Sequence, residues 1–135
     1  MSRARIFELM SRREAARLAA LSRDHAAVLG QVRQAEALSQ RLSRMRDDLA
    51  PRQGVTAAAT LRDAGLLAAG LAAEADRQQG RIEQARHEAE RLRLLIGQHD
   101  QRRRLSADAA TAARAEAAAE AEARAAALTP VRRNP

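Results

Sequence analysis

The chain has 135 residues, the length of one domain, and its 24 basic and 17 acidic residues give a formal net charge of +7. One Phe and no Trp, Tyr or Cys exclude an ordinary globular core, disulfides and thiolate metal sites. Every basic residue is arginine, which suits bidentate contact with carboxylates or phosphates. No apolar run approaches the ~20 residues of a membrane span, and the N-terminus lacks the apolar core of a signal peptide, so we expect a cytoplasmic protein.

The first predicted element is a helix over residues 2–49, for which Ser2 is the expected N-cap. Its apolar residues recur at spacings of three and four, with phase slips near Glu14 and at Ala35. Twelve steps cover 42 residues, a mean of 3.5, which is the heptad value and predicts a left-handed coiled coil. The expected seam is Phe7, Met10, Glu14, Leu18, Leu21, His25, Val28, Val32, Ala35, Leu38, Leu42, Met45 and Leu49.

Residues 50–56 interrupt the helical pattern. Pro51 lacks the N–H that a helix interior needs, and Gly54 can adopt positive φ and reverse the chain. A short polar turn between two amphipathic helices makes them antiparallel neighbours. The alternative is a kink in one continuous helix.

The second predicted helix covers residues 57–128, followed by a disordered tail at 129–135. Its expected seam is Leu61, Ala64, Ala68, Leu71, Ala75, Gln78, Ile82, Ala85, Ala89, Leu92, Ile96 and His99. With the turn centred near residue 54, residue i should face residue 108 minus i, which leaves Ser106–Leu128 without a partner. The predicted fold is therefore all-α, a single domain forming a two-helix antiparallel coiled-coil hairpin with a longer second helix. Because each seam is already covered, we expect a monomer.

The hairpin would gather arginines at its base and large apolar residues at its tip, which suggests two different contacts. The expected basic site is Arg3, Arg5, Arg12, Arg13, Arg91, Arg93, Arg102, Arg103 and Arg104. The expected apolar site is Leu38, Leu42, Met45, Leu49, Leu67 and Leu71. The alternative interpretation is solvated arginines at the base and the last turns of the seam at the tip.

Catalytic patterns are lacking in the sequence. His25, His87 and His99 should lie at different levels of the hairpin, and the chain contains no phosphate-binding loop, dinucleotide fingerprint or zinc-protease motif. We therefore expect no enzymatic activity, no metal, no cofactor and no small-molecule ligand.

Two long helices, a short polar turn, a longer second helix and a basic end resemble the FliJ family of flagellar export proteins. The local similarity lies in Gln34-Ala35-Glu36 with the leucines that follow, and in the apolar stretch Leu66–Leu71. The resemblance implies a central stalk like the γ subunit of rotary ATPases. One end would enter the ring of the flagellar export ATPase, and another surface would contact the export-gate membrane protein or substrate chaperones. The protein would then lie at the cytoplasmic face of the inner membrane.

Two other classes stay open at this point. A basic coil could bind nucleic acid, although interleaved acids and the lack of aromatics for base stacking disfavour it. A general coiled-coil scaffold or chaperone, including the stalk of an injectisome-type secretion system, would have the same sequence pattern.

Overall fold

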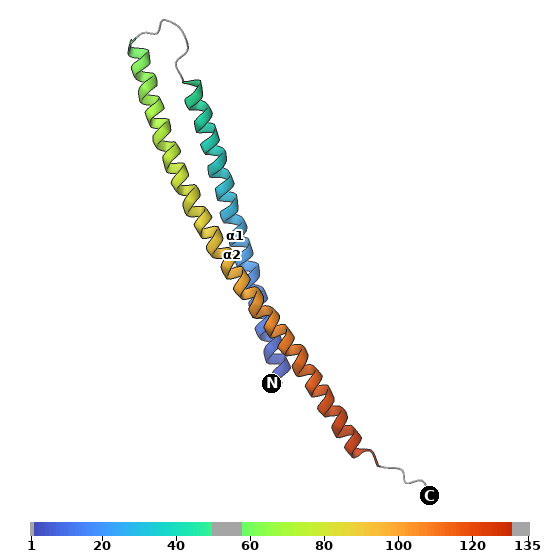
Figure 1. Ribbon diagram of the computed structural model, residues 1–135. Coiled ribbons are helices and arrows are strands. Elements are labelled where there is room, and N and C mark those ends of the chain that lie inside the picture. The colour runs from blue at the N-terminus through green and yellow to red at the C-terminus, as the bar shows by residue number, and fades with distance from the viewer. Residues whose placement is uncertain (1, 50–57, 131–135) are drawn as a thin grey trace. The chain divides into compact units, whose positions relative to one another are not determined.

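The computed structural model describes residues 2–49 and 58–130 (Figure 1). They form helix α1 (Arg3–Asp48) and the longer helix α2 (Ala58–Leu128), which pack against each other, and no strand occurs in these two ranges. The predicted all-α fold of two packed helices with a longer second helix is confirmed, and both helices lie within two residues of their expected bounds. The predicted turn, 50–56, and residues 131–135 of the predicted tail lie outside the described residues.

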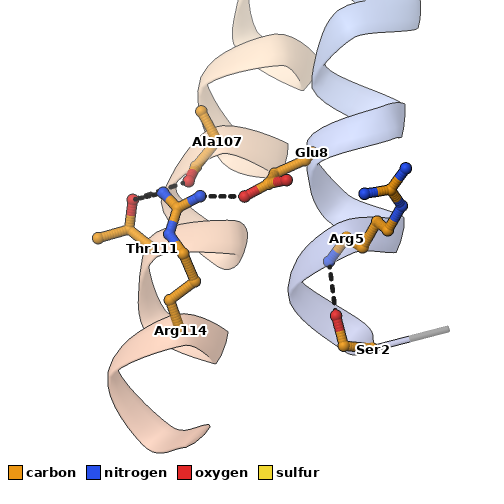
Figure 2. Close-up of polar contacts among 6 residues, drawn as sticks. All are labelled: Ser2, Arg5, Glu8, Ala107, Thr111 and Arg114. Carbon is orange, nitrogen blue, oxygen red and sulfur yellow. Dashed lines mark hydrogen bonds and ion pairs between the residues drawn. The ribbon is translucent and has the colours of Figure 1, made fainter. Parts of the chain in front are cut away.

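The chain divides into two compact units, which we describe separately. The terminal unit comprises residues 1–21 and 95–135, and the central unit comprises residues 22–94. In the terminal unit, Ser2 caps α1, because its hydroxyl oxygen accepts a 3.2 Å hydrogen bond from the Arg5 backbone N–H (Figure 2). This hydrogen bond confirms the predicted start of the first helix.

The seam of α1 keeps a stricter repeat than predicted. From Ala4 to Leu42, partly or fully buried residues recur at alternating steps of three and four, and Ser11 and Ser39 occupy seam positions. Three predicted seam residues, Met10, Leu38 and Met45, are instead 47%, 37% and 49% exposed. The two predicted phase slips are therefore wrong. A continuous 3.5-residue period keeps one stripe of α1 against α2, and this period places serines in the seam although their neighbours are more apolar.

The seam of α2 is confirmed from Ala64 to His99, whereas Leu61 is 53% exposed. The same steps continue through Arg103, Ser106, Ala110 and Ala113. Ser106 and Ala110 are only 8% and 2% exposed. The prediction that Ser106–Leu128 has no partner is thus wrong for its first part, because small residues can pack in a seam without an apolar signature. Every residue of Ala115–Leu128 is exposed, and we call this stretch the free segment, although Glu116, Ala117 and Glu120 at its start still line an open groove with Arg3 and Ala4 of α1.

The predicted pairing rule is also wrong. It places residue 94 opposite Glu14 and residue 100 opposite Glu8, whereas the structure pairs these side chains with His99 and Arg114. Long side chains lean toward the N-terminus of their own helix, so in an antiparallel pair they reach partners beyond the directly opposing residue. In the central unit, the pairing rule places residue 59 opposite Leu49, whereas Leu49 and its neighbours line a groove with residues 61–68 of α2. The first residues of α2 therefore lie beyond the end of α1.

Candidate partner-binding surfaces

On each helix, one row of residues borders the seam on either side. The bordering rows of the two helices lie together and form the two flanks of the coil. One flank bears ion pairs between the helices. In the terminal unit Arg114 contacts Glu8 (Figure 2), and in the central unit Arg86 contacts Glu36 at 2.5 Å. We call this the paired flank, and the opposite one the open flank.

In the terminal unit, the open flank holds a groove of about 270 Å³ lined by side chains of both helices. Arg13 of α1 and Arg102 of α2 line it, and neither forms an ion pair with any residue in the described ranges. Met10 and Leu105 add apolar surface and are 47% and 61% exposed. We call this site the basic groove. Arginines beside exposed apolar side chains suit an acidic amphipathic partner.

Glu14 also lines the basic groove, but its carboxylate already has a partner. His99 Nδ1 lies 2.5 Å from Glu14 Oε2, and the two side chains are only 12% and 15% exposed. The hydrogen bond with His99 lowers the pKa of Glu14, and the nearby charges of Arg17 and Arg102 act in the same direction. The sequence marked both residues as polar seam positions but did not pair them, because the predicted register put residue 94 opposite Glu14.

The other predicted basic residues differ in their surroundings. Arg103 and Arg104 both contact Asp100 at 2.9 Å. In the central unit, Arg91 contacts Glu88 at 2.6 Å and Arg93 contacts Glu90 at 2.7 Å. These four arginines are therefore partly neutralised by their own helix. Within the described part of the chain, no ion pair involves the remaining members of the predicted site, which are Arg3, Arg5, Arg12, Arg13 and Arg102.

The predicted apolar site lies in the central unit and contains both buried and accessible members. Leu42 packs in the seam at 8% exposure, so it is not available to a partner. Leu49 and Leu71 are half-buried. The accessible members of the predicted site are Leu38, Met45 and Leu67, at 37%, 49% and 54% exposure. Leu61 and Leu66, at 53% and 70%, enlarge this exposed apolar surface.

Two further grooves occur in the central unit. One, of about 470 Å³, is lined mainly by apolar residues, including Leu49, Leu61 and Ala68. The other, of about 550 Å³, is lined by several amide side chains, which are Gln31, Gln34, Gln78 and Gln84. Gln78 is 2% exposed and donates a 2.9 Å hydrogen bond to Glu74, so it is a buried polar member of the α2 seam.

Residues 2–49 and 58–130 contain no group of three His, Asp or Glu side chains placed to hold a metal ion. Neither described helix has an apolar stretch long enough to cross a bilayer.

No protein-family model, curated protein or solved structure matches this chain. The resemblance to FliJ therefore stays a prediction, and the case for a function depends on the coil and its surfaces.

Proposed function

We propose that the chain is a non-enzymatic, stalk-like component of a flagellar type III protein export apparatus, with a role in flagellum biogenesis and motility. The observation that supports this most is the architecture itself. An unbroken α2 of 71 residues packs against the 46-residue α1 and continues past its start. Two packed helices with a longer second helix are among the features on which the resemblance to FliJ depends.

In this proposal, the arginines of the terminal unit contact the ring of the export ATPase. Arg13 and Arg102 are the strongest candidates, because they line a groove and have no ion pair within the described ranges. The exposed apolar residues of the central unit contact the export-gate membrane protein or substrate chaperones. The protein then works in the cytoplasm, at the inner face of the membrane that holds the export gate.

A binding experiment with purified export ATPase and the cytoplasmic domain of the export gate tests this function. Replacing Arg12, Arg13 and Arg102 together with Gln should weaken ATPase binding. Exposed arginine–carboxylate pairs contribute about 0.5 kcal/mol each, so the three changes should cost about 1.5 kcal/mol and raise Kd about 10-fold, and more at low salt. Helix content should not change, because glutamine is a good helix former.

The matched control replaces three exposed arginines of the central unit, Arg23, Arg33 and Arg41, with Gln. It removes the same charge and should leave ATPase binding intact. Loss of binding in both variants would indicate a non-specific charge effect. If the first variant keeps the ATPase but loses affinity for DNA, the stalk proposal is wrong and a nucleic-acid-binding coil replaces it.

The gate contact needs a separate variant. Replacing Leu38, Met45 and Leu67 with Ser should spare ATPase binding and impair binding to the gate domain. Leu42 is left unchanged, because its burial in the seam would turn a binding test into a stability test. Unchanged binding to both the gate domain and substrate chaperones would refute a partner role for this surface.

A further inference from the structure

The basic groove belongs to a longer face of the terminal unit that carries no acidic residue on its exposed rows. On α1, Ile6 and Arg17 lie one turn before Met10 and one turn after Arg13, on the same side of the helix. On α2, Gln98 and Ala109 extend the row of Arg102 and Leu105 in the same way. Ile6 is 44% exposed, so two bulky apolar side chains, Ile6 and Met10, are followed by two arginines, Arg13 and Arg17, along about 12 residues, or roughly 18 Å of helix.

The free segment, Ala115–Leu128, has the complementary chemistry. It contains three glutamates and one arginine, so its net charge is negative. With the helical period, Ala115, Ala119, Ala123 and Ala126 form one stripe of small residues. Glu116 and Glu120 border one side of this stripe, Glu122 borders the other, and Arg124 lies on the far side. The free segment is thus an acidic amphipathic helix whose alanine stripe is lined on both sides by carboxylates.

The free segment cannot reach the basic groove of its own chain. It continues α2 without a break, so it projects away from the groove past the start of α1 (Figure 1). Its length, about 21 Å, matches the length of the groove.

We propose that two copies of this chain associate through their terminal units, each placing its free segment in the other's basic groove. A two-fold axis satisfies both contacts at once, because groove and free segment follow each other directly along α2. Glu120 and Glu122 of one copy then face the arginines on the two walls of the other copy's groove. Met10 and Leu105 pack on the alanine stripe. The expectation of a monomer was based on the seams alone. The basic groove adds exposed apolar side chains that lie outside them.

This proposal does not depend on the export function, but both assign a partner to Arg13 and Arg102, so the export ATPase would have to displace the second copy from the basic groove. The dimer is tested with the full chain alone. Sedimentation equilibrium should give twice the 14.7 kDa chain mass, with weaker association at high salt. A groove variant, Arg13→Glu with Arg102→Glu, should shift the mass to that of a monomer. So should a segment variant, Glu120→Arg with Glu122→Arg. Far-ultraviolet circular dichroism of each variant checks that the helices persist.

The decisive measurement mixes the two monomeric variants in equal amounts. In a mixed pair, the acidic segment of one chain meets an arginine groove, and the arginine segment of the other meets an acidic groove. The mixture should therefore regain the dimer mass, which a merely destabilising effect would not produce. A matched control, Arg33→Glu with Arg41→Glu, changes the charge equally in the central unit and should stay dimeric.

Three results would overturn the proposal. If the groove variant or the segment variant stays dimeric on its own, the copies meet through another surface. A mixture of the two variants that stays monomeric would also refute the proposed contact. A wild-type chain that is monomeric at its highest soluble concentration would assign the basic groove to an acidic helix of a different protein.

Discussion

Replacing Ile82 with Ala should show that seam residues of the central unit contribute more to its stability than exposed residues do. Ile82 is 3% exposed on α2, and the substitution deletes three carbon atoms. Burial of each methylene contributes ~0.8 kcal/mol, so the transfer loss is about 2.4 kcal/mol. Alanine recovers a few tenths of a kcal/mol through its higher helix propensity, which leaves about 2 kcal/mol.

This value lies at the low end of large-to-small core substitutions, which reach about 5 kcal/mol where an enclosed cavity is left. In the described part of this chain no large side chain is completely buried, so solvent can reach the space that Ile82 leaves. For a domain of this size, 2 kcal/mol lowers Tm by about 6–12 °C.

Thermal unfolding followed by circular dichroism measures the shift, with Leu61→Ala as the control. The sequence pattern places Leu61 in the same seam, but the structure leaves it 53% exposed, so its replacement should cost less than about 1 kcal/mol. Equal losses of Tm for the two variants would refute the seam described here.

Three further predictions concern contacts between the helices of one unit. Ser11 lines a groove of about 250 Å³ beside small residues of α2, so Ser11→Leu should raise stability by about 1 kcal/mol in chemical denaturation, whereas exposed Arg12→Leu should change it by under about 0.5 kcal/mol. The pKa of Glu14 is lowered, so the stability from its hydrogen bond is complete above the unfolded-state pKa and is lost as pH falls through the folded-state value. Glu14→Gln should therefore show a shallower loss of Tm below about pH 5 than the wild type, and parallel curves would contradict this. A double-mutant cycle on Glu36 and Arg86, which are 41% and 60% exposed, should give a coupling below about 1 kcal/mol that high salt removes.

The sequence predicted the two helices and most of their seams because isoleucine, leucine and alanine recur at heptad spacing. It failed where an apolar residue stands beside a serine, as at Met10 and Leu38. Hydrophobicity alone selects the methionine or leucine there, whereas the period of the whole helix selects the serine.

The candidate site was predicted by residue type but not by position. Arg13 and Arg102 were both expected in a basic site, yet their common groove depends on the register between the helices. That register follows from the lean of long side chains and from where α2 begins, and neither can be derived from the spacing of residues along the chain. For the same reason the pairing of Glu14 with His99 was not predicted.

The unbroken heptad repeat makes the length of this coil adjustable without any change in its chemistry. Removing seven residues from α1 and seven from the matching level of α2 would return every remaining side chain to the same side of its helix. The groups on either side of such a deletion would move closer by about 10 Å. The spacing of these groups can therefore change by whole repeats while each contact surface keeps its composition. The length of the coil is thus independent of what its surfaces bind.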